Sequence, residues 1–276
     1  IAAAAILGRE QMKLRHILSA VLAATIGLSA GTALADDHEG DSLIQEITER
    51  GVLRACHAEA LPWGIKDPKT GEWVGSDVEA ANHLAETMGV KAEHVDTAWA
   101  TLIPSLETGK CDIVMAPMFA TPERAMKVLF ADPAGFESMS IAVSADSGIT
   151  SYADLDVDGK SVAVISGTAD ESFSNRYFKK AEVKPSVTDK LATVFLEVAS
   201  KRADAVLTDT STLHRMVKEN APMKLMVLGG DPLNPQGYSY AVRPGEYHFI
   251  NFVNIWQKFI AREGLKEMWH NKFTQE

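Results

Sequence analysis

The segment TPER at 121–124 places an arginine in the first turn of a predicted helix. Thr121 can cap that helix, and Pro122 suits its first position. The start of a helix exposes free N–H donors and the positive end of its dipole, and Arg124 adds a planar two-pronged donor. These groups together suit a carboxylate, so Arg124 is our first candidate for a ligand contact. An ion pair with a surface acid is the alternative role of this arginine.

Two further polar residues follow predicted strands in the second half of the chain. Thr168 comes after SVAVI at 161–165, in a turn that can offer a hydroxyl and backbone N–H groups to the same anion. Asp209 comes after DAVLT at 204–208, and its carboxylate can hold an ammonium group. Because ligands of α/β sheets bind beyond the carboxyl ends of strands, we expect both residues near Arg124. Capping of a helix is the alternative role of Asp209.

Aromatic residues follow predicted strands in the first half of the chain. Trp63 and Trp99, together with Phe119, can form the walls of an apolar slot, and aromatic rings can also surround a cationic group. Each ring taken singly is better explained by core packing. Glu59 and His57 lie shortly before Trp63, and we include them as candidate ligand contacts whose roles the sequence does not define.

The signatures of common enzyme classes are missing from the sequence. There is no GxGxxG, HExxH or GxSxG motif, and GKS at 159–161 lacks the earlier glycine of a phosphate loop, because Asp154 stands there. The eight histidines do not cluster at the spacing of metal ligands. We therefore predict no catalytic residue, no metal site and no cofactor.

The elements that position these residues alternate between strand and helix. VLRAC at 52–56 is followed by a helix that Asp77 can cap, and then by DIVMA at 112–116. The alternation resumes in the second half, which is typical of parallel sheets with helices on both faces. Two such series, joined by extended segments near 136–145 and 230–240, predict an α/β fold of two lobes with a cleft between them.

Residues 12–35 have the three parts of a secretory signal peptide. A basic start is followed by an apolar stretch from Ile17 to Leu28 and by the small-x-small pattern that ends at Ala35. The apolar stretch is too short to cross a hydrocarbon core, which needs about 20 residues. Position 36 is Asp, not the cysteine of a lipoprotein. We predict a free periplasmic protein that does not insert into the membrane after cleavage, and we interpret residues 1–11 as upstream sequence or a cloning remnant.

The chain is acidic and has two cysteines. Its 37 Asp and Glu residues exceed its 27 Lys and Arg residues, for a formal charge of -10, which argues against nucleic acid and anionic membranes as partners. Cys56 and Cys111 could pair in an oxidising compartment. However, Cys56 ends one predicted strand and Cys111 precedes another, which places them at opposite ends of parallel neighbours. The sequence slightly favours two buried free thiols.

Five segments occur in a recognisable order, and they cover essentially the whole mature chain: GVLRACHAEALPWGIKD, GEWVGSDVEAANHLAETMGV, TAWATLIPSLETGKCDIVMAPMFATPERA with VLFADP, GKSVAVISGTA, and RADAVLTDTS. In this order they resemble the periplasmic solute-binding proteins of polar amino-acid ABC transporters, of the family 3 type. TPER followed by FADP is the most specific part of the resemblance. The likeness implies a two-lobed type II "Venus flytrap", with lobe 1 formed by roughly 42–136 and 238–276 and lobe 2 by roughly 140–232.

The resemblance also implies roles for several candidate residues. Arg124 matches the family arginine that grips the α-carboxylate of the ligand, and Thr168 matches a contributor to that grip from the second lobe. Asp209 matches the acid that holds the α-ammonium group. Trp63 and Trp99 match positions where aromatic side chains commonly line the slot.

Two positions depart from the family pattern. Pro117 and Phe119 stand where amino-acid binders often have Gly or Ser and then Thr or Ser, so a hydroxyl and an N–H contact to the ligand are lost, since proline has no N–H donor. Phe119, within MFATPER and before VLFADP, also resembles ectoine-binding members that collect compatible solutes. An ectoine-like ligand is therefore an alternative to an amino acid.

The sequence thus predicts a monomeric extracytoplasmic receptor that delivers a small zwitterion, first of all an amino acid, to the permease of an ABC importer. A lyase is the alternative from another class, because cyclohexadienyl dehydratases resemble these binding proteins. Such an enzyme needs a general acid in the cleft, for which Glu171 or Glu59 would be the candidates.

Overall fold

The computed structural model describes residues 42–274. The predicted signal peptide at 12–35 and the residues 1–11 lie outside the described residues. Within 42–274, no helix is both long enough and apolar enough to cross a membrane.

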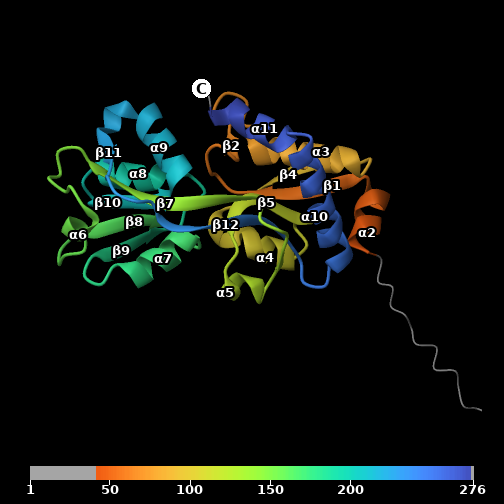
Figure 1. Cartoon of the computed structure of the whole chain (residues 1–276), viewed down its shortest axis with the longest axis horizontal. Coiled ribbons are helices and arrows are strands. Elements are labelled where there is room, and N and C mark those ends of the chain that lie inside the picture. The colour runs from red at the N-terminus through yellow and green to blue at the C-terminus, as the bar shows by residue number, and fades with distance from the viewer. Residues whose placement is uncertain (1–41, 275–276) are drawn as a thin grey trace, which may run out of the picture. The chain divides into compact units, whose positions relative to one another are not determined.

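Ten strands of the described chain form one sheet, in the hydrogen-bonded order β4-β1-β5-β12-β7-β10-β8-β9, with β11 paired to β7 and β6 paired to β12 (Figure 1). The first three strands of this order are parallel to one another: β4 (Lys91–Asp96), β1 (Val52–His57) and β5 (Ile113–Phe119). The last three are also parallel: β10 (Ala205–Asp209), β8 (Ser161–Ile165) and β9 (Glu182–Ser186).

Two long antiparallel strands connect the parallel sets. β7 (Gly135–Ser144) and β12 (Leu233–Val242) pair with each other, and each also pairs antiparallel with a neighbouring strand of one parallel set. They contain most of the extended segments predicted near 136–145 and 230–240. The boundaries of the two predicted lobes stay a prediction. Short strands complete the set: β2 (Ile65–Lys66), β3 (Trp73–Val74), β6 (Leu129–Phe130) and β11 (Leu225–Val227).

Helices pack against both parallel sets (Figure 1). In the first half of the chain and at its end they are α2 (Leu43–Arg50), α3 (Ser76–Thr87), α4 (Leu102–Glu107), α5 (Pro122–Ala125), α10 (Tyr247–Arg262) and α11 (Leu265–Thr274). The remaining helices are α6 (Tyr152–Leu155), α7 (Ala169–Tyr177), α8 (Ala192–Ala199) and α9 (Thr210–Glu219), and 3-10 turns lie at Trp99–Thr101 and Ala221–Met223. Every residue of β5 and of β8 is buried, as expected for strands covered on both faces. The predicted α/β fold class is confirmed.

Two local predictions differ from the structure. Strand β5 extends to Phe119, so Pro117 and Phe119 lie inside the strand and not after it. Pro117 fits there because the register between β5 and β12 shifts between Ser239 and Ala241. At such an irregularity the missing N–H of proline is tolerated. Asp77 does not cap α3; the cap position is Gly75, and Asp77 is the second helical residue.

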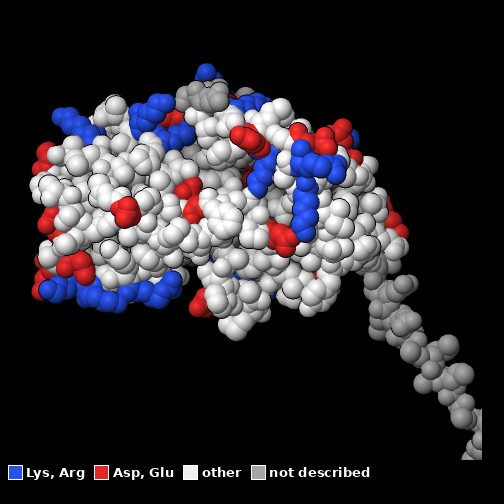
Figure 2. Space-filling model, viewed as in Figure 1, with Lys and Arg blue, Asp and Glu red and all other residues white. Residues whose placement is uncertain are grey.

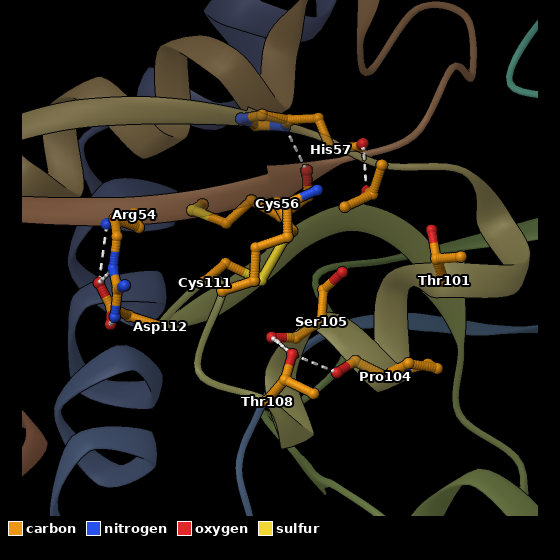
Figure 3. Close-up of a disulfide and its surroundings, with 12 residues drawn as sticks. Arg54, Cys56, His57, Thr101, Pro104, Ser105, Thr108, Cys111 and Asp112 are labelled. Carbon is orange, nitrogen blue, oxygen red and sulfur yellow. Dashed lines mark hydrogen bonds and ion pairs between the residues drawn. A yellow bond between two sulfur atoms is a disulfide. The ribbon is translucent and has the colours of Figure 1, made fainter.

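Cys56 and Cys111 form a disulfide, with their Cα atoms 5.7 Å apart (Figure 3). The prediction of two free thiols is wrong. The pairing of β1 with β5 begins at Ala55 opposite Ile113, so β5 starts beside the second half of β1. Cys111, two residues before β5, therefore lies near Cys56 and not at the far end of β1. An ion pair between Arg54 and Asp112, with 2.7 Å between Nη2 and Oδ1, lies next to the disulfide.

Candidate ligand-binding site

A small cavity lies where β5, β8 and β10 end, and we call it the Arg124 cavity. Its volume of about 30 Å³ is room for roughly two water molecules. Eight of the nine candidate residues line it: Glu59, Trp63, Trp99, Pro117, Phe119, Arg124, Thr168 and Asp209. The structure thus brings together residues that are up to 150 positions apart in the chain.

The Arg124 guanidinium joins two segments at this cavity. Nη1 donates to the carbonyl oxygen of Phe119 at 2.9 Å, and Nη2 donates to that of Gly167 at 3.0 Å. The side chain starts from α5, which Thr121 caps as predicted by accepting a bond from the Arg124 N–H at 3.3 Å. Burial lowers the pKa of Arg124, but a guanidinium stays charged in proteins. Because it has five N–H donors, it keeps capacity for a carboxylate.

The turn after β8 closely approaches Ala100, which follows Trp99. Gly167 has φ +80°, and a Cβ atom at this position would lie 2.5 Å from the Cα atom of Ala100. Only glycine fits this conformation and this contact. Thr168, the next residue, uses its hydroxyl inside the turn, where it donates to Ile165 O at 2.7 Å and accepts from Glu171 N at 3.2 Å. The hydroxyl of Thr168 is therefore already bonded, and the residue shapes the wall of the cavity.

Asp209 and an acid that the sequence analysis did not name, Asp170, both line the cavity and lie close enough for their charges to interact. Asp209 caps α9 by accepting a bond from Thr212 N at 2.8 Å, so the alternative role is realised while the residue still lines the cavity. Asp170 accepts from the Thr208 hydroxyl at 3.3 Å. Burial raises the pKa of Asp170 to about 7, and the Thr208 hydroxyl and the Arg124 guanidinium oppose this rise. Burial, and after it the nearby Asp170, raise the pKa of Asp209 well above its ordinary value.

The aromatic and glutamate candidates hold the remaining walls. Trp99 Nε1 donates to the Glu59 carbonyl oxygen at 3.1 Å, and the Trp63 ring packs edge-on against Tyr238 at 5.4 Å between centroids. The Glu59 carboxylate accepts a bond from Leu191 N at 2.9 Å. These contacts fix both tryptophans and tie the segment after β1 to the start of α8.

His57 is the one candidate that does not line the cavity. It is buried within β1, where Nδ1 lies 2.7 Å from Met115 O and Nε2 lies 2.9 Å from His94 Nδ1. A carbonyl oxygen can only accept, so we assign the His57 proton to Nδ1 and the bond between the rings to a His94 donor. Burial, and then the neighbouring His94, lower the pKa of His57 to about 3. His57 is a neutral core residue.

Acids dominate the charged groups of the Arg124 cavity. Glu59, Glu137, Asp170 and Asp209 face a single arginine, whereas the outer face in Figure 2 carries side chains of both signs. The positive charge of a bound ligand would favour the ionised forms of Asp170 and Asp209. No group of three or more His, Cys, Asp or Glu residues within 42–274 is placed to hold a metal ion. The site can therefore grip an anionic group at its arginine and a cationic group at its acids.

Sequence reasoning missed Asp170, Glu137 and Thr208. An acid in the first turn of a helix is the usual complement of the helix dipole, so Asp170 carried no separate signal. Its position two residues after Thr168, in the turn that was already predicted to face a ligand, was the available signal. Glu137 lies on β7, and only the sheet topology brings it to the cavity.

An α/β fold with a polar cavity beyond the carboxyl ends of its strands is typical of proteins that bind small ligands. A model of the bacterial extracellular solute-binding proteins, family 3, matches residues 53–276. The chain belongs to this family.

Individual relatives are binding proteins for amino acids. The ABC transporter glutamine-binding protein GlnH of Bacillus subtilis (strain 168) is 28% identical over 217 residues, which cover 78% of this chain and 77% of GlnH. A mutant of ArgBP from T. maritima has a similar structure, with a TM-score of 0.78, 33% identity, and coverage of 85% of this chain and 100% of ArgBP. AncCDT-1, an ancestral amino acid-binding protein described as a precursor of cyclohexadienyl dehydratase, has a TM-score of 0.76, 35% identity, and coverage of 84% and 100%.

Proposed function

We propose that this solute-binding protein is a periplasmic, monomeric receptor that binds an amino acid with a cationic side chain in the Arg124 cavity and presents it to the permease of an ABC importer. The single observation that carries this proposal is the composition of the cavity wall, in which one half-buried arginine faces four acids. Arg124 would hold the α-carboxylate, and Asp209 the α-ammonium group. Of the three remaining acids, Glu59 is already ion-paired with Lys190, and Glu137 and Asp170 would compensate the charge of the side chain.

Ligand entry requires the cavity walls to part, because about 30 Å³ does not admit an amino acid. The walls belong to the two predicted lobes, 42–136 with 238–276 and 140–232. Arg124 bonded to Gly167 and Glu59 bonded to Leu191 would then be contacts of the closed form. A ligand that binds the closed form better than the open form shifts the population toward closure.

The lyase alternative is less well supported. Of the two acids that the sequence offered as its general acid, Glu171 accepts a bond from Gly167 N at 2.7 Å outside the cavity, and Glu59 is bonded to Leu191 N. Asp170 is a buried carboxyl beside Arg124, and it is the residue that favours keeping this candidate. We propose binding without turnover, and incubation with prephenate or arogenate tests this, since product formation would contradict a receptor that only binds.

Calorimetry on the mature protein tests the main proposal. Arginine, lysine, glutamine and ectoine are titrated, and we expect the cationic amino acids to bind most tightly. Arg124→Ala should weaken that binding by roughly 2 to 5 kcal/mol, which is about 30-fold to several thousand-fold. Arg262→Ala, which removes an exposed arginine of α10, is the matched control and should leave the affinity unchanged. Unchanged affinity of Arg124→Ala would remove Arg124 from the site, and silence toward all four ligands would overturn the proposal.

A further inference from the structure

A second cavity adjoins the Arg124 cavity, and we call it the Asp77 cavity. It opens between α3, α11 and the strands β7 and β12, and its volume is about 360 Å³. This volume lies within the range of roughly 300 to 1,000 Å³ that small-molecule sites have. Trp63 and Glu137 line both cavities, so the two share a wall.

Buried polar atoms without a partner gather at the Asp77 cavity. Trp63 Nε1, Ser76 Oγ and Asp77 Oδ2 have no hydrogen-bond partner among the described residues, and all three residues line the cavity. The residues are only 2%, 6% and 4% exposed. In the rest of the described chain, Ser174 Oγ is the only other such atom. Since a buried polar group without a partner costs free energy, this concentration at one cavity points to a ligand.

The charges around the cavity favour a cation. Asp77 Oδ1 accepts a bond from the Tyr240 hydroxyl at 2.9 Å, and its other carboxylate oxygen is unpaired. Glu137 and Glu267 also line the cavity, whereas Lys266 is its only Lys or Arg. Burial lowers the pKa of His270 below its ordinary value of 6.5, so this ring adds no positive charge at neutral pH.

The apolar part of the wall is largely aromatic. The rings of Trp63, Tyr238 and Trp269 belong to it, and Phe136, which is 80% exposed, lies on the same wall. The face of an aromatic ring attracts a cation, and the same ring packs well against an apolar body. A carboxylate and aromatic rings that line the same cavity therefore suit an ammonium group that is attached to a small apolar group.

We propose that the Asp77 cavity is a second binding site, which takes a small organic amine with its ammonium group at Asp77 and its apolar body against Trp63 and Trp269. The amine needs no α-carboxylate, because the cavity has no arginine. This distinguishes its ligand from the one that we assign to the Arg124 cavity.

Indole N–H resonances of the 15N-labelled protein test this proposal with benzylamine as the probe. The five tryptophans give one resonance each, and Trp269 and Trp99 report separately on the two cavities. We expect benzylamine to shift the Trp269 resonance to saturation and to leave that of Trp99 in place. Benzyl alcohol, which has the same ring but no charge, is the matched control and should shift neither. A shift of Trp99 alone would place the amine in the Arg124 cavity, and no shift at all would overturn the site.

Charge variants give effects of opposite sign on benzylamine binding. At about pH 8, above the Asp77 pKa of about 7, Asp77→Asn should weaken it about tenfold, because the ion pair is lost, and Lys266→Gln should tighten it about threefold, because a like charge is removed. Lys266 is only half-buried, so its variant keeps the proposal testable if the Asp77 variant fails to fold. Arg124→Ala should leave benzylamine binding unchanged, so failure of the amino-acid proposal and failure of this one are distinguishable. Equal affinities of wild type, Asp77→Asn and Lys266→Gln would overturn the assignment.

Discussion

The two cavities share Trp63 and Glu137 but differ in volume and in the groups that surround their buried acids. In the Arg124 cavity the buried acid Asp170 lies near a guanidinium, and the cavity volume is about 30 Å³. In the Asp77 cavity the buried acid has a tyrosine hydroxyl and a half-buried lysine as neighbours, and about 360 Å³ stays open. Burial raises the pKa of both acids to about 7. Two acids that are buried to a similar extent therefore line a small cavity in one place and a much larger one in the other.

The largest effect that we expect from these two acids is on the pH dependence of the free energy of unfolding. Each of the two acids has a folded pKa of about 7 against an ordinary value of 3.8, so the native state holds its proton where the unfolded state does not. The stability from each acid is fully present below pH 3.8 and is lost as the pH rises through about 7. Asn has no such proton. As the pH rises between these limits, the free energy of unfolding of Asp77→Asn should therefore increase by on the order of 4 kcal/mol relative to that of wild type.

Urea denaturation at about pH 5 and about pH 8 measures the larger part of this gain, about 3 kcal/mol in the free energy of unfolding, because the rest falls between pH 3.8 and about pH 5. Asp170→Asn is the partner variant, and equal burial predicts a gain of the same size. A smaller gain for Asp170→Asn would mean that the Arg124 guanidinium compensates the ionised acid, which would sharpen the difference between the cavities. Parallel pH curves for wild type and both variants would contradict the raised pKa values.

Sequence patterns could predict the Arg124 cavity but not the Asp77 cavity, for a physical reason. Arg124 and Asp209 each lie within a few residues of a strand's carboxyl end, and such ends meet wherever parallel strands share a sheet. The Asp77 cavity draws its walls from five distant parts of the chain, and α11 reaches α3 only through the tertiary fold. The disulfide was mispredicted for a related reason, because a one-dimensional pattern does not fix the register between β1 and β5.

A smaller effect is expected on the affinity of the Arg124 cavity for its amino-acid ligand. Asp209→Asn should remove a charge-assisted bond to the α-ammonium group, at a cost of about 1.5 to 3 kcal/mol, or about 10- to 150-fold in affinity. Asn keeps the shape of Asp and can still cap α9. Asp77→Asn should change this affinity by less than about twofold, because it acts in the other cavity. Calorimetry measures both, and a reversed order would assign the amino acid to the Asp77 cavity.

The smallest effect concerns a single hydroxyl that ties the segment before Trp63 to α9. Thr212 Oγ1 accepts from Leu61 N at 3.0 Å and donates to Leu61 O at 2.9 Å. Thr212→Val keeps the shape and loses both bonds, at a cost of roughly 1 kcal/mol or somewhat more.

If this pair of bonds forms only when the Arg124 cavity closes, Thr212→Val should destabilise the closed form and leave the open form unchanged. The affinity for the amino acid should then fall by about fivefold. Calorimetry measures that loss, and Thr48→Val, whose hydroxyl bonds only within α2, is the matched control. Benzylamine should bind the Asp77 cavity of Thr212→Val with unchanged affinity, because that cavity is open in the same structure. An equal loss for both ligands would mean that the two cavities open and close together, and the comparison between a closed site and an open one would fail.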